Sequence, residues 1–279
     1  MPTNPEARGT FSRRVAPFAP LALALTMNAV HSPSTVPANR GGGAPAGAFV
    51  PTCLPFAGQP NPAIDDRCGF DGGSSDPAKQ AQSRAKNNLC AATGSPRQVS
   101  YQELIDLQAK TSTQNVRGLV DRGPLNKLGE GEFVEYVAFI ADAHYSHVGS
   151  GEAVNCNIPG DSTNDIHIVL VQHPGDDPCS STTAEMIPHY RPSGWTDKNL
   201  MAVNTHPVRV RGPLFYDDSH TPCTAHSRPN PKRVSLWEIH PVYSLDVCTL
   251  TDLDKCKNSS TPADWVPLEE WASDPNSDQ

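Results

Sequence analysis

The chain has 279 residues and carries 30 acidic against 22 basic side chains, a formal net charge of −8 at neutral pH. Proteins that bind nucleic acids usually present a basic surface, so this balance argues against a general nucleic-acid partner or an anionic membrane. The 28 prolines and 20 glycines exceed average usage and predict much irregular chain around one modest core.

Residues 1–38 have the pattern of an export segment. Arg13 and Arg14 precede the apolar run 15–25, as the charged region precedes the hydrophobic region in a secretory signal peptide. The apolar run is too short for a transmembrane helix, which needs about 20 residues. We therefore expect an exported protein, periplasmic or extracellular, without a membrane span.

Two short helices are predicted before residue 129. Asp76 is placed to cap a helix that begins at Pro77, a residue that is well tolerated in the first helical turn. Ser100 and Glu103 have the spacing of a capping box at the start of a second helix. In a capping box, each of the two side chains accepts a hydrogen bond from the other residue's backbone N–H. Both helices are expected to precede the main β domain.

Beyond residue 129 the pattern changes to strands, with β-branched and aromatic runs bounded by Gly, Pro and Asp. The predicted strands are 132–144, 164–172, 183–187, 207–214 and 234–247, the last of them broken at Pro241. Five strands with long connections favour a small antiparallel barrel, and an OB-like barrel is the leading interpretation. Residues 188–202 would close it as a helix or loop. A β-sandwich is the alternative, but it normally needs about seven strands.

The predicted fold class is therefore mainly β, a small OB-like antiparallel barrel preceded by a loop-rich segment with one or two short helices. The pattern divides the chain into five segments. They are an export segment (1–38), a Pro/Gly-rich linker (39–75), a helical N-terminal extension (76–128), the OB-like barrel (129–250) and an acidic polar tail (251–279).

The chain has eight cysteines, an even number, and none of them forms a C-x-x-C pair. This spacing disfavours a zinc ribbon or a thioredoxin-like site, and in an exported protein it favours disulfides. We expect the bridges Cys156–Cys179 and Cys223–Cys248, because these four residues lie at the ends of predicted strands.

Several motifs between residues 117 and 250 occur together, among them NDIHIVLV from Asn164 and LWEIHPV from Leu236. As a group they resemble a set of uncharacterised exported bacterial proteins with an OB-like barrel. The resemblance implies a barrel and a bacterial, exported setting. It implies no activity, so no catalytic residues are transferred from it.

Two predicted strands each place an acid and a histidine on one face. Because alternate side chains of a strand share a face, Asp165 lies beside His167, and Glu238 lies beside His240. His220, in the loop after the fourth strand, adds another donor. Imidazole nitrogens and carboxylate oxygens are ligands for zinc, iron or manganese. These five residues are the candidate ligands of a transition metal.

The same alternation predicts which residues of these strands lie in the core. Trp237 and Ile239 should point into it, with Glu238 on the opposite face. Truncation of Trp237 should therefore cost more stability than truncation of Glu238. Glu185, on the third strand, and Asp217, in the loop after the fourth, extend the polar set.

Three functions remain open. The first, which we expect, is a non-catalytic exported binding or structural module without a cofactor, in which the acid–histidine pairs are buried hydrogen bonds. The second is a secreted metal-dependent hydrolase of an ester or phosphate, or the same pairs acting by metal-free acid–base chemistry. The third, single-stranded nucleic-acid binding, rests on fold analogy alone. Aromatic side chains on an acidic barrel would suit a neutral glycan or a peptide better than nucleic acid.

Overall fold

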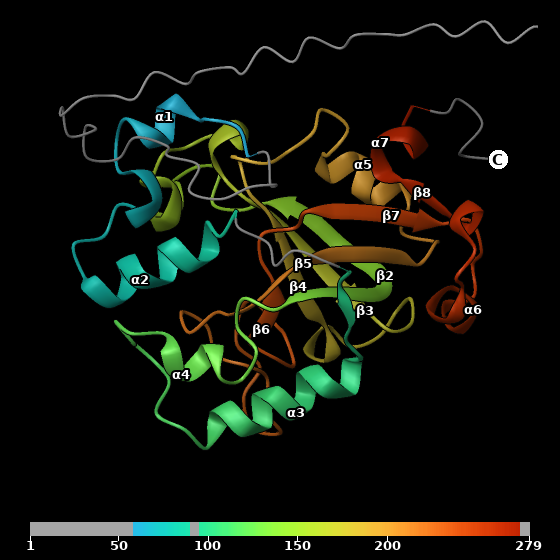
Figure 1. Ribbon diagram of the computed structural model, residues 1–279, viewed down its shortest axis with the longest axis horizontal. Coiled ribbons are helices and arrows are strands. Elements are labelled where there is room, and N and C mark those ends of the chain that lie inside the picture. Colours follow the sequence, from blue (N-terminus) through green and yellow to red (C-terminus); the bar gives the residue numbers. More distant parts are fainter. Residues whose placement is uncertain (1–57, 90–94, 274–279) are drawn as a thin grey trace, which may run out of the picture. The chain divides into compact units, whose positions relative to one another are not determined.

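The computed structural model describes residues 58–89 and 95–273, all of which belong to one compact unit (Figure 1). The predicted export segment, most of the predicted linker, and two cysteines, Cys53 and Cys90, lie outside these ranges. Within them, no helix is both long enough and apolar enough to cross a bilayer.

Five strands close into a barrel, as the sequence predicts. They are β2 (Phe133–Tyr145), β3 (Ile166–Val171), β4 (Thr182–Met186), β5 (Val208–Tyr216) and β6 (Trp237–Ile239). The order around the ring is β2–β3–β4–β6–β5, and β5 returns to pair with β2. Neighbours are antiparallel except β4 and β6, which run parallel. Each barrel strand lies on a predicted strand, so the mainly β class and the barrel are confirmed.

The long strand β2 belongs to both sides of the barrel. Its residues 133–138 pair with β5, and residues 139–145 pair with β3. The register with β3 shifts between Ile140 and Asp142, which is the signature of a β-bulge. A bulge bends a strand and increases its twist, so the strand can turn the corner that closes the barrel.

The last predicted strand is interrupted at Pro241, as expected. It forms β6 and β7 (Ser244–Cys248), and both pair with β5. Proline has no N–H to donate to the ladder, so the pairing stops there. Opposite this break, a Cβ atom at Gly212 would lie 2.2 Å from the carbonyl oxygen of Pro241. Only glycine permits this close approach.

The two predicted helices begin where their capping residues indicate. Asp76 accepts a hydrogen bond from the Ala78 N–H (2.8 Å), and Ser100 accepts one from the Glu103 N–H (3.1 Å). The helices are α1 (Pro62–Asp65), α2 (Pro77–Lys86), α3 (Tyr101–Ser112), α4 (Gly123–Asn126), α5 (Asp197–Ala202), α6 (Leu253–Asn258) and α7 (Leu268–Trp271). Of these, α5 lies within the segment predicted to close the barrel. Ile64 of α1 is buried, so the described part of the predicted linker is folded.

Residues 251–273 are folded against the barrel, whereas the sequence predicts a polar tail. They carry α6, β8 (Trp265–Pro267) and α7, and β8 pairs with β7 at the end of the sheet (Figure 1). Leu253, Trp265 and Leu268 are buried. These few apolar side chains are outnumbered by polar neighbours, so the average composition of the segment hides them. A further short strand, β1 (Arg97–Gln98), pairs with β2.

Disulfides are present, but both predicted pairings are wrong. The observed bridges are Cys68–Cys156, Cys179–Cys223 and Cys248–Cys256. The prediction assumed that cysteines flanking one strand meet each other. Instead, Cys156 meets the chain before α2, and the other bridges join neighbouring loops or a strand to the helix that follows it. Strand positions alone do not reveal which loops lie side by side.

The face assignment on β6 is confirmed for Trp237 and Ile239, which lie in the main hydrophobic core. Glu238 does lie on the opposite face, but it is also buried, with 1% of its surface exposed. Its carboxylate accepts a hydrogen bond from buried Arg233 (2.8 Å). Truncating Glu238 would leave that guanidinium unpaired, so the predicted gap in stability between the two truncations becomes smaller.

Trp237→Ala is expected to lower the free energy of unfolding by about 3–5 kcal/mol, because it opens a large cavity in the core. Trp237→Phe is the matched control. It keeps most of the ring packing against Tyr216, 5.4 Å away between centroids, and it removes an indole N–H that has no hydrogen-bond partner among the described residues. Chemical denaturation measures both losses. Equal losses in the two variants would contradict the core position.

Candidate functional site

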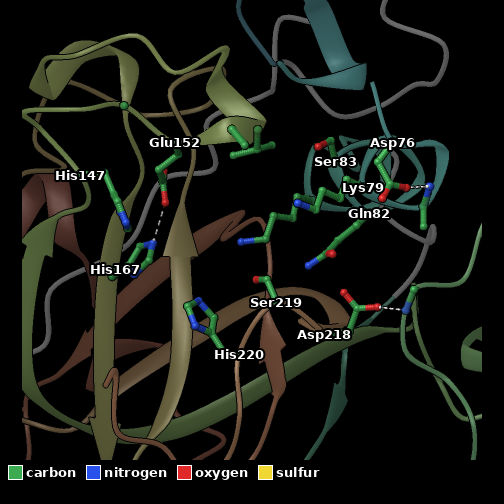
Figure 2. Close-up of a pocket in the computed structure, with 16 residues that line it drawn as sticks. Asp76, Lys79, Gln82, Ser83, His147, Glu152, His167, Asp218, Ser219 and His220 are labelled. Atoms are coloured by element: carbon green, nitrogen blue, oxygen red, sulfur yellow. Dashed lines mark hydrogen bonds and ion pairs between the residues drawn. The ribbon is translucent and has the colours of Figure 1, made fainter. Parts of the chain in front are cut away.

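A pocket of about 540 Å³ lies between α2 and two loops of the barrel (Figure 2). One loop connects β2 to β3, and the other follows β5. The pocket is lined by side chains that include Lys79, Gln82 and Lys86 of α2, His147 and Glu152 of the first loop, His167 of β3, and Asp218, Ser219 and His220 of the second loop. Polar and ionisable residues are the majority of the lining, and Ala78, Ala153 and Val154 add apolar surface.

Because side chains alternate along a strand, the polar side chains of β3 and β4 lie on one face of the barrel. In the register of β3 and β4, His167 lies directly opposite Glu185. Their neighbours Ile166, Ile168 and Ala184 are in the hydrophobic core. His167 and Glu185 therefore point away from the barrel interior, toward α2 and the two loops.

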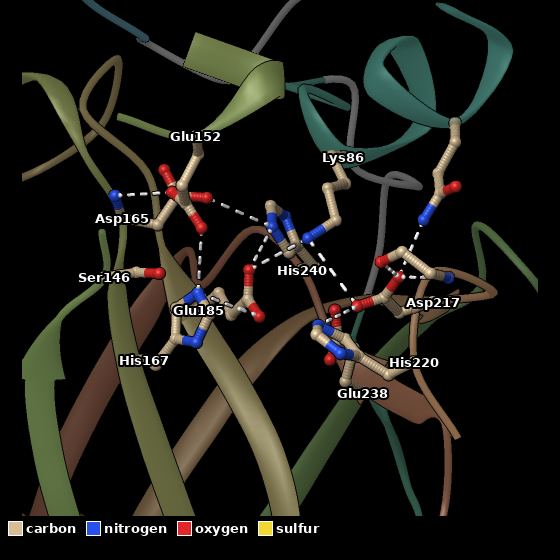
Figure 3. Close-up of polar contacts among 12 residues, drawn as sticks. Lys86, Ser146, Glu152, Asp165, His167, Glu185, Asp217, His220, Glu238 and His240 are labelled. Carbon is tan, nitrogen blue, oxygen red and sulfur yellow. Dashed lines mark hydrogen bonds and ion pairs between the residues drawn. The ribbon is translucent and has the colours of Figure 1, made fainter. Parts of the chain in front are cut away.

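Glu185 lies at the centre of a buried cluster of charged side chains (Figure 3). Its Oε2 atom lies 2.8 Å from His240 Nε2 and 3.2 Å from Lys86 Nζ. Its Oε1 atom lies 3.3 Å from His167 Nε2. Asp165 Oδ2 lies 3.5 Å from the same nitrogen of His240. One carboxylate thus contacts three basic groups from three different elements.

A second carboxylate, Asp217, lies at the other side of Lys86. Its Oδ2 atom is 3.4 Å from His220 Nε2, 3.8 Å from Arg233 Nη1 and 3.9 Å from Lys86 Nζ. Arg233 also donates to Glu238 at 2.8 Å. Lys86 therefore stands between Glu185 and Asp217, and Arg233 stands between Asp217 and Glu238.

The pKa values in the cluster depend on burial and on the charges that each group faces. Burial alone would lower the pKa of His240, but the Glu185 carboxylate outweighs it and raises that pKa to about 10. The same balance raises the pKa of His167 to about 9. Burial raises the pKa of the Glu238 carboxyl to about 8, and the charges of Glu185 and Asp217 act in the same direction. The raised pKa values favour the positively charged form of the two histidines and the neutral form of the Glu238 carboxyl, so none of the three groups adds negative charge beside Glu185.

Two groups of side chains have the composition of cation sites. One is Asp165, Glu185 and His240, and the other is Glu185, Asp217 and Glu238. In each group the ligand atoms lie within 4.8 Å of one another. Carboxylate oxygens with an imidazole nitrogen suit a divalent transition metal, and carboxylates alone suit a harder cation.

Several atoms of the first group make no hydrogen bond to any described residue. They are Asp165 Oδ2, Glu185 Oε1 and His240 Nε2, and all three are buried. Each of them lies in an ion pair: His240 Nε2 is 2.8 Å from Glu185 Oε2 and 3.5 Å from Asp165 Oδ2, and Glu185 Oε1 is 3.3 Å from His167 Nε2. Two carboxylates and an imidazole gathered at one buried point are also a donor set that suits a divalent cation.

The structure brings all five sequence-predicted ligands into this cluster. Asp165 and His240 belong to the first group, and Glu238 belongs to the second. His167 and His220 lie at the pocket wall, where His167 Nε2 is 3.2 Å from Glu152 Oε1 and His220 is paired with Asp217. Whether any of them binds a metal stays a prediction.

Three important members of the cluster were not predicted, namely Lys86, Glu152 and Arg233. Lys86 ends a short polar helix far from the barrel in the sequence, and no local pattern indicates which residue it meets. Glu152 and Arg233 lie in loops, where side-chain alternation predicts nothing. Glu152 falls within GEAVNC (residues 151–156), another of the motifs between residues 117 and 250 that carry the resemblance, and this was the one available signal.

Comparisons of the chain with family models, with curated proteins and with solved structures give no match. A functional assignment therefore rests on the chemistry of the cluster. The cluster supplies the donor atoms of a cation site, and the neighbouring pocket wall supplies the imidazoles of His167 and His220.

Proposed function

We propose that the protein is an exported metal-dependent hydrolase that acts on an ester or a phosphate in the pocket of Figure 2. One observation carries the proposal. Asp165, Glu185 and His240 converge with their ligand atoms within 4.8 Å, and all three side chains are buried. Two carboxylates and an imidazole are a donor set that divalent transition metals bind.

Asp165, Glu185 and His240 would hold the metal. The bound ion would act as a Lewis acid and lower the pKa of a water molecule, which is the usual contribution of such a site to hydrolysis. His167 and Glu152 both line the pocket, and their 3.2 Å contact makes them an acid–base pair beside it. His167 Nε2 is therefore the atom at which we expect a proton to be exchanged with the substrate.

We also propose that the barrel is OB-like. In chain order its third and fifth strands, β4 and β6, form the parallel pair, and α5 lies between the third and fourth strands. OB-folds bind ligands with the loops after their first and fourth strands. Here those loops carry Glu152 and His220, and both residues line the pocket.

Export is part of the same proposal. The three disulfides among the described residues support it, because such bonds persist mainly in oxidising compartments. The predicted signal segment, 1–38, lies outside the described residues. Mass spectrometry of the native N-terminus would test whether that segment is removed.

The metal is tested by chelation. Protein purified after incubation with zinc or manganese should retain about one ion per chain, measured by elemental mass spectrometry. A chelator should lower its melting temperature, because a ligand that binds only the native state stabilises it, by about 2.7 kcal/mol at 100 times its Kd. His240→Ala should abolish this response. His206→Ala is the matched control, since His206 contacts the Cys248 carbonyl outside the cluster.

The same chelation experiment can also exclude the hydrolase. If the wild-type chain retains no ion after metal supplementation and its melting temperature does not respond to chelator, the hydrolase is excluded. The acid–histidine pairs would then be structural, and the protein would be the non-catalytic binding module that the sequence favours. In that case His240→Ala should still lower stability, by about 1–3 kcal/mol, with or without chelator.

A further inference from the structure

We infer that the buried cluster contains two adjoining cation positions. The ammonium of Lys86 occupies the second position, where a second metal ion would otherwise bind. The inference rests on the proposed function, because it assigns the second of two adjoining sites. The second position is formed by Glu185, Asp217 and Glu238, whose oxygens lie within 4.8 Å of one another.

The shared ligand is Glu185, which belongs to both groups. Carboxylates that belong to two cation sites occur in two-metal centres, where the ions stand about 3.5–4 Å apart and act together on a substrate. In this chain the Lys86 Nζ atom lies 3.2 Å from Glu185 Oε2 and 3.9 Å from Asp217 Oδ2 (Figure 3). The ammonium therefore lies between two of the three carboxylates of the second group, those of Glu185 and Asp217.

The remaining charges agree with this division. In the second group, Arg233 lies against both Glu238 and Asp217, so two fixed cations face the three carboxyl groups. In the first group, the His240 imidazole is the third donor, with its Nε2 atom 2.8 Å from Glu185 Oε2 and 3.5 Å from Asp165 Oδ2. The exchangeable ion is therefore assigned to the first position, which holds no lysine or arginine, whereas Lys86 and Arg233 fill the second.

Two carboxylate oxygens of the second group make no hydrogen bond to any residue in the described ranges. They are Asp217 Oδ2 and Glu238 Oε1, and both side chains are at most 1% exposed. These atoms are the ligands that would become available to a metal if the ammonium were removed. Lys86 comes from α2, outside the barrel, so its removal leaves the barrel strands that supply Glu185 and Glu238 intact.

Lys86→Met tests the assignment, because it removes the charge and keeps most of the side-chain length. The number of manganese or zinc ions per chain should rise from one in the wild type to two in the variant, measured by elemental mass spectrometry after gel filtration. Adding Glu238→Gln to Lys86→Met should return the number to one. Lys79→Met is the matched control. Lys79 lies on the same helix and lines the pocket, but it is exposed, so the count should stay at one.

The outcomes separate this inference from the proposed function. One ion in both the wild type and folded Lys86→Met would overturn the inference and leave the hydrolase standing. No ion in the wild type but one in Lys86→Met would support the ammonium as a substitute cation and exclude the hydrolase. No ion in either chain would overturn both.

A second variant keeps the inference testable if Lys86→Met does not fold. Glu238→Gln alone, which can still accept from Arg233, should leave the wild-type count at one, because Glu238 belongs to the position that Lys86 fills. Asp165→Asn should abolish the ion. Loss of the ion in Glu238→Gln would show that Glu238 is a ligand of the exchangeable metal, and the division into two positions would be wrong.

Discussion

Glu185→Gln is expected to abolish metal retention and to lower the free energy of unfolding by about 3–5 kcal/mol. The substitution preserves the shape of the side chain but removes the charge that faces His240, His167 and Lys86. Loss of one partner from a buried ionic cluster leaves the other charges uncompensated, which accounts for the magnitude. Elemental mass spectrometry and chemical denaturation measure the two effects on the same preparations.

Glu135→Gln is the matched control for this variant. Glu135 makes the same kind of contact, accepting from Arg211 at 3.0 Å, but both side chains are partly exposed and lie outside the cluster. Surface ion pairs contribute about 0–1 kcal/mol, so the control should lose little stability and no metal. If Glu185→Gln lost stability but kept its ion, Glu185 would be a structural charge and not the shared ligand.

Strand alternation predicted the barrel wall of the site, because a strand has a fixed period of two residues. That period placed Asp165 near His167 and Glu238 near His240, and the structure keeps each pair on one side of the barrel wall. The same rule assigned Trp237 to the core. What it could not indicate is that the outer face at Glu238 is covered, since burial depends on which distant segment packs over the strand.

The rest of the site is set by long-range packing. Lys86 meets Glu185, 99 residues away in the sequence, only because α2 lies over the barrel wall. The pairing of Cys68 with Cys156 has the same origin, and the sequence-based pairings failed for that reason. A helix cap such as Asp76 is encoded by its neighbours and was predicted correctly, whereas the position of the capped helix is not a local property.

Removal of the Cys68–Cys156 disulfide is expected to cost about 2–5 kcal/mol of stability and to weaken metal binding. The bridge fastens the chain before α2 to the loop that carries Glu152. Next to it, the Gly73 N–H donates to the Ala153 carbonyl at 2.7 Å. Loosening this junction would release the loop in which the Asn155 side chain donates to Asp165 Oδ1 at 2.9 Å, so a proposed metal ligand would lose its support. Serine replacements at both cysteines, followed by urea denaturation and metal titration, measure the two effects.

The Cys248–Cys256 bridge provides the matched control, because its partners are 8 residues apart and those of Cys68–Cys156 are 88 apart. Loop-closure entropy grows with the logarithm of that separation, so removal of the longer bridge should cost roughly 2 kcal/mol more. The short bridge joins β7 to α6, outside the pocket lining, so its removal should leave the metal affinity unchanged. Equal losses of stability from the two removals, together with an unchanged metal affinity in both, would show that the junction before α2 does not position the site.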